Sequence, residues 1–358
     1  MPGFLRAVAP TPFVTVQDRG RQGWRRFGVS GSGAMDPDQL AIANVLVGNP
    51  PQQAGLEFAY AGGVWEVCAG LCRIAVAGGR FAVAVDGVAL PPFASATLRR
   101  GQYLAIGAAP DAVWGYLAVA GGFALPRQLG SLSTHARSGI GGFGGRALGP
   151  GDALPLTAER AGGGSERRIA PPPVASEPIG LVPGPQADRF TDAAMETLLA
   201  GEWRVGRHSD RMAYRLEGPP LAHRDGHDIV SDGTMPGSIQ VPGNGTPLVL
   251  MRDCQTTGGY PKIATVVTAD LPRLAQLRPG AALRFRALTV EEAQGLAARR
   301  AARLLRLLRT IPHLGEAWRP AEAGMRPGQM FQARARRSGS PAAPALTTDL
   351  VAASGAAR

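Results

Sequence analysis

The first half of the chain carries short apolar runs at the spacing of β-strands. Residues 73–77, 81–85, 103–106 and 114–119 are rich in small and branched apolar residues, and Gly-Gly, Pro-Pro and Asp-Gly turns punctuate this region. The 49 glycines and 31 prolines also fit many short strands joined by turns. The pattern predicts a mainly β fold and favours barrels or sandwiches over a doubly wound sheet.

Helical periodicity is confined to a few segments. Residues 38–46 follow an Asp-Pro start signal and end at Gly48. A shorter helical stretch is expected near residues 192–199. Residues 289–310 predict a basic amphipathic helix, with Thr289 and Glu292 at capping-box spacing. Its apolar stripe consists of Ala297, Ala301, Leu304 and Leu308.

A Gly-rich and Pro-rich stretch at residues 161–173 is the clearest linker. We therefore predict an N-terminal domain over residues 1–170 and a second β domain over residues 175–288. The basic helix follows, and residues 311–358 are Ala/Pro/Arg/Gly-rich and aperiodic, which predicts a mostly disordered tail.

The composition indicates a soluble protein with sizeable cores. The chain has 358 residues, 45% of them hydrophobic. It contains no apolar run of about 18 residues and no signal-peptide pattern, so we expect a cytoplasmic protein without a membrane segment. Three cysteines are too few for a disulfide framework. We expect Cys68 and Cys72 in the core, and Cys254 has no neighbouring histidine that would activate it.

The net charge of +11 does not by itself indicate nucleic-acid binding. From Thr289 onward the chain has 11 arginines and 5 acidic residues, which is +6 of the total and leaves +5 for the preceding 288 residues. That density is low for a surface that follows a phosphate backbone. We therefore expect no nucleic-acid partner.

One lysine marks a candidate site. Lys262 is the only lysine among 38 basic residues, and it ends a polar segment that begins at Asp253. An ammonium is a compact charge that arginine does not replace. Strand-like runs at residues 247–251 and 263–268 flank the segment, which predicts a hairpin or a strand-end loop. Chance survival of one surface lysine and an ordinary polar loop remain the alternatives.

Several known site types do not fit the residues. Lys262 lies between proline and isoleucine, so it belongs to neither a P-loop nor a biotinyl carrier, and no covalent biotin is expected. The glycines of residues 139–145 lack the βαβ context of a dinucleotide site. His223 and His227 lack a third metal ligand and are better explained as turn residues, so no metal is expected.

Several separate motifs resemble one family. They lie at residues 16–23 (Val-Gln-Asp-Arg-Gly-Arg-Gln-Gly), 32–36 (Ser-Gly-Ala-Met-Asp), 43–49, 182–186 (Val-Pro-Gly-Pro-Gln), 209–216, 237–242 and 255–262 (Gln-Thr-Thr-Gly-Gly-Tyr-Pro-Lys). Together they resemble the allophanate hydrolase subunit 2 family, also called KipA-like or the C subunit of 5-oxoprolinase, and the carboxyltransferase half of urea carboxylase.

The resemblance implies two cyclophilin-like β-barrel domains and partner proteins. The partners would be a KipI-like B subunit (allophanate hydrolase subunit 1) and an amidohydrolase subunit of the LamB/YcsF type. The implied activity is ATP-dependent opening of the 5-oxoproline lactam to glutamate. The alternatives are carboxyl transfer to urea or a similar amide with free or carrier-borne biotin, and a non-enzymatic KipA-like module that binds a KipI-like inhibitor.

The resemblance also suggests which residues act. Lys262 is expected near a developing oxyanion or a phosphate, with Tyr260 and Gln255 as orienting donors. Arg211 and Arg215 could clamp an anion, with Asp210 as their structural partner. Further candidates for substrate binding are Gln240, Thr256, Thr257, Gly258 and Gly259, and from the first domain Gln17, Asp18, Arg19, Met35 and Asp36. A packed turn and a helix start explain this first-domain set nearly as well.

Overall fold

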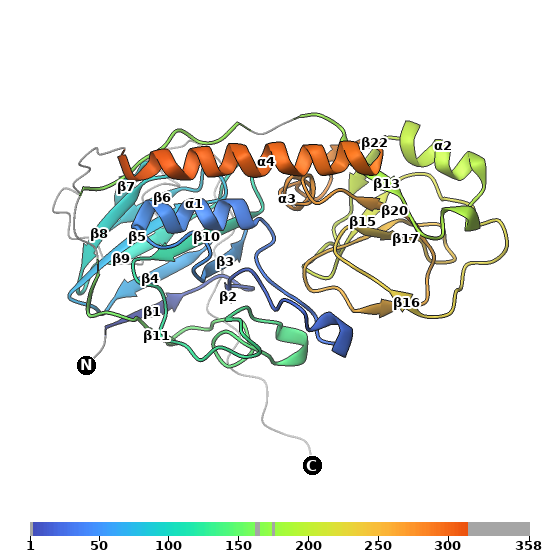
Figure 1. Cartoon of the computed structure of the whole chain (residues 1–358). Helices are drawn as coiled ribbons and strands as arrows, with labels where there is room; N and C mark the ends of the chain where they lie inside the picture. The colour runs from blue at the N-terminus through green and yellow to red at the C-terminus, as the bar shows by residue number, and fades with distance from the viewer. Residues whose placement is uncertain (1–2, 162–164, 174–175, 314–358) are drawn as a thin grey trace, which may run out of the picture.

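The computed structural model describes residues 3–161, 165–173 and 176–313. Two lobes built of β-strands lie side by side, and a long helix crosses both (Figure 1). We call residues 3–173 the first lobe and residues 176–288 the second lobe. The mainly β fold with few helices is confirmed, and one sheet closes into a nearly complete barrel.

Two sheets form the first lobe. Its strands are β1 (Phe4–Ala9), β2 (Thr15–Gln17), β3 (Gly55–Ala59), β4 (Gly63–Val67), β5 (Leu71–Ala77), β6 (Val83–Val85), β7 (Val88–Leu90), β8 (Ser95–Arg99), β9 (Tyr103–Ile106), β10 (Trp114–Val119), β11 (Ala153–Pro155) and β12 (Arg160–Ala161). One sheet has the order β11-β1-β4-β9-β6-β7, and the other has the order β12-β5-β10-β3-β2 with β8 paired to β5. Predicted strands at residues 103–106 and 114–119 are confirmed at both ends.

An eight-stranded sheet forms most of the second lobe. Its order is β21-β14-β15-β18-β17-β20-β13-β22, and β16 and β19 form a separate pair. The bounds are β13 (Ile179–Pro183), β14 (Trp203–Val205), β15 (Ala213–Glu217), β16 (Asp232–Gly233), β17 (Ser238–Gln240), β18 (Leu248–Leu250), β19 (Thr257–Gly258), β20 (Lys262–Val266), β21 (Ala282–Leu283) and β22 (Phe285–Ala287).

The helices are short, apart from the last one. They are α1 (Pro37–Val47), α2 (Asp192–Ala200), α3 (Leu271–Ala275) and α4 (Val290–Thr310), with 3-10 turns η1 (Arg25–Phe27), η2 (Ala136–Ser138), η3 (Ala187–Arg189) and η4 (Ile311–His313). The predicted helices near residues 38–46, 192–199 and 289–310 are confirmed. Thr289 and Glu292 form the expected capping box.

The two lobes share an apolar core, and β10 shows why. Leu117 and Val119 point into the core inside the first lobe. Trp114, Tyr116 and Ala118 alternate with them and belong to a second core that includes α1 and the interior of the second lobe. A strand buried on both faces therefore joins the lobes through continuous packing.

Helix α4 ties the lobes together on one side. The Arg300 guanidinium donates to Asp38 Oδ2 at 2.7 Å in α1 and also to the Ala269 carbonyl in the second lobe. Leu308 and Ile311 are buried beneath the end of the helix. Of the predicted disordered tail, residues 311–313 form η4, and residues 314–358 lie outside the described residues.

The Lys262 segment is a strand-end loop rather than a hairpin. Strands β18 and β20 lie on opposite sides of β17, so the chain passes over the end of β17 between them. On the way it forms β19, which pairs with β16 through Asp232 opposite Gly258 and Gly233 opposite Thr257. Two loops from distant parts of the second lobe therefore meet beside Lys262.

Among the described residues, no helix is both long enough and apolar enough to cross a membrane. The predicted domain division near residue 170 stays a prediction.

Candidate functional site

Lys262 is a buried cation at the start of β20. Only 2% of the residue is exposed, and its register partner Gln240 on β17 is equally buried. Ile239 and Val241 on either side of Gln240 lie in the apolar core, so Gln240 faces away from that core. An irregularity in the β17/β20 register sets Gln240 opposite Lys262, which places both polar side chains on one face.

Asp232 is the counter-ion of Lys262. Lys262 Nζ donates to Asp232 Oδ2 at 2.7 Å, and Gln186 Nε2 donates to the same oxygen at 3.1 Å. The hydrogen bonds from Lys262, Gln186 and the Gly233 amide lower the pKa of Asp232 to about 2. Because the side chain of Asp232 is 51% exposed, this ion pair lies where the buried site meets solvent.

Lys262 has more N–H donors than the described part of the protein uses. Within the described part of the chain, its ammonium makes one hydrogen bond, to Asp232. An ammonium has three N–H donors. Two donors of this buried cation therefore make no hydrogen bond to the described part of the protein.

Two glutamines complete the cluster. Gln255 Nε2 donates to Gln240 Oε1 at 3.1 Å, and Gln240 Nε2 donates to the Tyr260 carbonyl at 3.3 Å. The carbonyl of Tyr260 thus takes part, while the residue as a whole is 40% exposed. We call Lys262, Asp232, Gln186, Gln240 and Gln255 the lysine cluster.

The glycine of β19 lets the loop pack closely on the cluster. A Cβ atom at Gly258 would lie 2.6 Å from Gln240 Nε2 and 3.4 Å from Gln255 Nε2. Gly259 has more space, and its carbonyl accepts from the Ile229 amide at 2.9 Å. The Thr256 carbonyl accepts from the Thr234 amide at 3.0 Å, while Thr257 pairs with Gly233. These residues hold the two loops together through their backbones.

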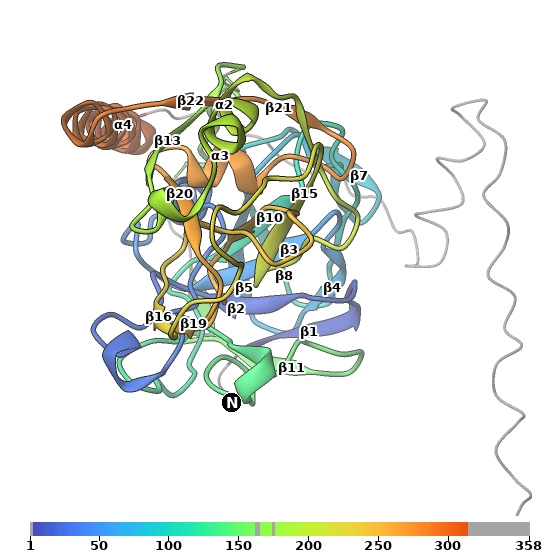
Figure 2. The same cartoon turned by 90° about the vertical axis from the view of Figure 1, so that its right-hand side faces the viewer.

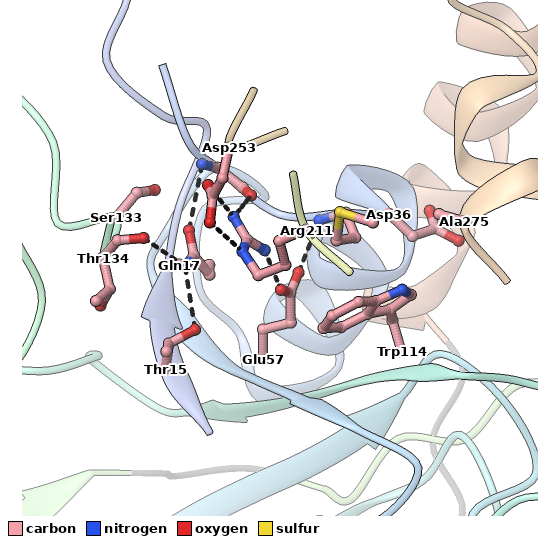
Figure 3. Close-up of polar contacts among 12 residues, drawn as sticks. Thr15, Gln17, Asp36, Glu57, Trp114, Ser133, Thr134, Arg211, Asp253 and Ala275 are labelled. Atoms are coloured by element: carbon pink, nitrogen blue, oxygen red, sulfur yellow. Dashed lines mark hydrogen bonds and ion pairs between the residues drawn. The ribbon is translucent and has the colours of Figure 1, made fainter. Parts of the chain in front are cut away.

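Arg211 is bound by two carboxylates and a carbonyl of the protein. Its Nε and Nη2 atoms bind the two oxygens of Asp253 at 2.8 and 2.9 Å, and its Nη1 atom binds Glu57 of β3. Nη2 also donates to the Gly33 carbonyl at 2.8 Å. Figure 3 shows Arg211 between the two carboxylates. Arg211 therefore joins the lobes, and the structure does not present it as an anion clamp.

The other proposed clamp residues lie elsewhere. Arg215 is exposed on β15, separated from β20 by β18 and β17, which is roughly 14 Å across the sheet. The prediction that Asp210 pairs with these arginines is wrong. Asp210 Oδ1 instead accepts from the Met212 and Ala213 amides at 2.7 and 3.1 Å, because the chain turns there into β15.

Met35 and Asp36 belong to the network around Glu57. Glu57 Oε2 accepts from the Met35 amide at 2.7 Å and from the Tyr116 hydroxyl at 2.9 Å. Asp36 caps α1 through the Gln39 amide and accepts from Gln276 Nε2 of the second lobe at 3.2 Å. Burial raises the pKa of Asp36 to about 6 and also raises that of Glu57, although the neighbouring Arg211 lowers the latter.

Gln17 and Asp18 are also structural. Gln17 donates to Thr15 Oγ1 and the Thr134 carbonyl and accepts from the Gly33 amide. Asp18 accepts from both Ser131 and Ser133 hydroxyls at 2.6 Å. Burial raises the pKa of Asp18, but these hydrogen bonds together hold it below its usual value. Arg19 is exposed.

The buried Cys254 thiol is not activated. The residue is 0% exposed, and burial raises its pKa although Arg25 acts in the opposite direction. Cys68 and Cys72 are buried as predicted. In the described ranges no group of three or more His, Cys, Asp or Glu side chains is placed to hold a metal ion.

The sequence did not reveal four contributors to this region: Asp232, Gln186, Thr234 and Arg25. Gln186 ended a recognised motif, which was a usable signal, but Asp232 lay in an unremarkable Ser-Asp-Gly turn. Arg25 comes from the first lobe and donates at 2.8 Å to the carbonyls of both Thr234 and Gln255.

Comparisons with known proteins agree on one family. The model of the carboxyltransferase domain, subdomain A and B, matches residues 27–287. The chain is 39% identical to the C subunit of 5-oxoprolinase from Haemophilus influenzae over 283 residues, covering 79% of this chain and 91% of that protein. It is 36% identical to the C subunit of 5-oxoprolinase from Escherichia coli over 289 residues, covering 81% and 93%.

A solved structure extends the comparison. The crystal structure of the K. lactis urea amidolyase superposes with a TM-score of 0.78 at 27% identity. The match covers 90% of this chain and 20% of that much longer one.

Proposed function

Because the chain belongs to the family of carboxyltransferase domains with subdomains A and B, we propose that it is a subunit of an ATP-dependent 5-oxoprolinase. In this proposal it opens the 5-oxoproline lactam to glutamate together with partner subunits. Support comes from two relatives named as the C subunit of 5-oxoprolinase, which align over more than nine-tenths of their lengths. The partners would be a KipI-like B subunit and a LamB/YcsF-like amidohydrolase subunit.

The lysine cluster is the observation that carries the proposal. Opening a lactam places negative charge on the carbonyl oxygen, and a preorganised donor stabilises that charge most when it is shielded from water. Lys262 is buried, has two free N–H donors in the described structure, and lies beside a carboxylate whose pKa is about 2. We assign Lys262 to the carbonyl or phosphate oxygen on which charge develops.

The remaining residues then have supporting roles. Gln240 and Gln255 form a hydrogen-bonded pair beside the ammonium, and we assign Gln255 and the exposed Tyr260 to orienting the substrate. Asp232 holds the ammonium in place through the hydrogen bond at 2.7 Å. Arg211 acts at a distance, since its bond to Asp253 fixes the chain two residues before Gln255.

The cluster suits one oxygen better than a whole triphosphate. Proteins that bind ATP phosphates surround them with several backbone donors, a lysine and Mg²⁺. The lysine cluster offers one ammonium that is already paired with Asp232. We therefore assign ATP to the assembled complex, bound with a partner subunit, and assign the reacting carbonyl to this chain.

A second function uses the same site. The matching family is named for carboxyl transfer, and the K. lactis structure is a urea amidolyase. In that case Lys262 would stabilise charge on carboxyl oxygens during transfer from free or carrier-borne biotin to urea or a similar amide. A third possibility is a non-enzymatic KipA-like module that only binds its partner. Such a module would catalyse no reaction, and Lys262→Ala would leave its affinity for the partner unchanged.

Reconstitution distinguishes these functions. The chain is combined with its folded partner subunits, ATP and 5-oxoproline, and glutamate and ADP are measured. A parallel reaction contains bicarbonate, a biotinylated carrier and urea. Coupled formation of glutamate and ADP supports the 5-oxoprolinase. Carboxyl transfer without glutamate supports the second function, and no turnover in either reaction contradicts both.

A further inference from the structure

A loop of the first lobe reaches the lysine cluster in the second lobe. We call residues 20–33 the arm. Its base is closed by hydrogen bonds from the Arg21 amide to the Gly31 carbonyl at 2.7 Å and from the Ala34 amide to the Asp18 carbonyl at 3.0 Å. Its tip is η1, which ends at Gly28 with φ of 80°. The arm, deep blue, lies beside β16 in both views (Figures 1 and 2).

Arg25 at the tip bonds to two loops at once. Its Nη2 atom lies 2.8 Å from the carbonyl oxygens of both Thr234 and Gln255, and 3.7 Å from Cys254 Sγ. Thr234 Oγ1 also donates to the Gln255 carbonyl. The first loop carries Asp232 and the second carries Gln255, so one guanidinium fixes the spacing of the two chain segments that enclose Lys262.

The contact does not use every donor of the Arg25 guanidinium. Arg25 Nη1 is buried and has no hydrogen-bond partner among the described residues. A buried donor without an acceptor is unfavourable. Such a donor requires an explanation, and we relate it to the two carbonyl contacts that Nη2 makes.

We infer that Arg25 is a positioning residue of the lysine cluster, and that it acts across the lobes by holding the Thr234 and Gln255 loops together. Its effect on turnover rests on the proposed function. Its effect on the two loops does not.

Cys254 reports on the loops without any enzymatic assay. Arg25→Met keeps an unbranched side chain over the thiol and removes both hydrogen bonds to the carbonyls. Arg26→Met is the matched control, because Arg26 lies over the Phe27 ring at 4.9 Å and its residue is exposed. Alkylation of the chain by iodoacetamide is followed at each cysteine by peptide mass spectrometry, with buried Cys68 and Cys72 as internal references.

We expect alkylation of Cys254 on the order of tenfold faster in Arg25→Met, and unchanged in Arg26→Met. The direction of the change in the Cys254 alkylation rate distinguishes two explanations. Arg25 lowers the pKa of Cys254, so loss of its charge alone would slow the reaction, whereas opening of the loops speeds it. An unchanged or slower rate at Cys254 overturns the inference.

If Arg25→Met loosens the whole chain, Cys72 also reacts faster than in the wild type. Arg25→Lys is then the variant that tests the inference. Lysine retains the charge and several N–H donors on a shorter side chain. A rate at Cys254 below that of Arg25→Met, with Cys72 unchanged, supports the inference, and equal acceleration of Cys254 and Cys72 contradicts it. In the reconstituted complex, Arg25→Met should lower kcat on the order of tenfold with partial recovery in Arg25→Lys. If the wild-type complex forms no glutamate, the proposed function fails, and the Cys254 rates still decide the role of Arg25.

Discussion

Arg211 of the second lobe and Glu57 of the first lobe form an ion pair that is buried between the lobes. Glu57 is 0% exposed, and the same guanidinium binds both oxygens of Asp253. Through Asp253 this ion pair fixes the segment that carries Gln255 into the lysine cluster. The junction of the lobes is therefore two residues along the chain from a member of the lysine cluster.

Glu57→Gln should destabilise the protein by about 3 kcal/mol, because it leaves part of a buried guanidinium charge without compensation. The amide oxygen keeps an acceptor for the Met35 amide and the Tyr116 hydroxyl, and the amide NH2 group then faces Arg211 Nη1 in place of the carboxylate oxygen that accepts from it. Glu202→Gln is the control, since the Arg204–Glu202 pair is 56% and 44% exposed and should contribute under about 1 kcal/mol. Urea unfolding measures both, and equal small effects would contradict a buried ion pair.

The stability of the wild-type protein should fall between about pH 4 and pH 6 because of Asp36. Its carboxyl has a pKa of about 6 when folded, against a usual value of 3.8, chiefly because it is buried. The folded state therefore binds more protons than the unfolded state in this window, and stability is lost as pH rises. The contribution is up to about 3 kcal/mol, and it is complete below the lower pKa. Asp36→Asn should flatten this part of the curve of unfolding free energy against pH, and an unchanged slope would exclude Asp36 as the cause.

Asp232→Asn tests the counter-ion of Lys262. The carboxylate is held ionised with a pKa of about 2, so wild-type activity should show no acid limb from Asp232 above about pH 3. We expect the variant to lose roughly tenfold in kcat, since the asparagine amide oxygen can still accept from the ammonium but lacks the negative charge that holds it in place. Asp228→Asn changes a carboxylate that is 74% exposed and should retain wild-type turnover. Equal rates for the two variants would argue against a role for Asp232.

Adjacent glycines offer a matched pair of substitutions. In Gly258→Ala the new Cβ would meet Gln240 Nε2 at 2.6 Å, and this flexible amide would have to move away from Gln255. In Gly259→Ala the nearest atom is the Ile229 carbonyl oxygen at 3.5 Å, which is ordinary contact. We expect both proteins to fold with similar Tm, and only Gly258→Ala to lose activity. Similar turnover in both variants would mean that the glutamine pair is not needed.

Local signals predicted most of the fold. The capping box at Thr289, the helix near residues 38–46 and the strands at residues 103–106 and 114–119 depend on neighbouring residues, so the sequence alone identified them. The polar segment around Lys262 was also identifiable, because its glycines, glutamine and lysine are close together in the chain.

Long-range pairing could not be predicted in the same way. Asp232 reaches Lys262 only because β16 pairs with β19, and Arg25 reaches Gln255 only because the arm crosses between the lobes. The carboxylate partners of Arg211 were not predicted, because Glu57 and Asp253 are far from each other in the chain. A usable clue was Glu57, which stands between Leu56 and Phe58 in an apolar strand, where a buried carboxylate requires a cation.

Turnover of the reconstituted complex carrying Lys262→Met is the most direct test of the proposed site. Methionine keeps much of the side-chain volume and removes the ammonium, so the partner subunits should still bind while the developing oxyanion loses its donor. We expect glutamate formation to fall by about 10²-fold or more, with unchanged co-purification of the partners. Glutamate formation within about twofold of wild type would contradict the assignment of Lys262 to the reaction.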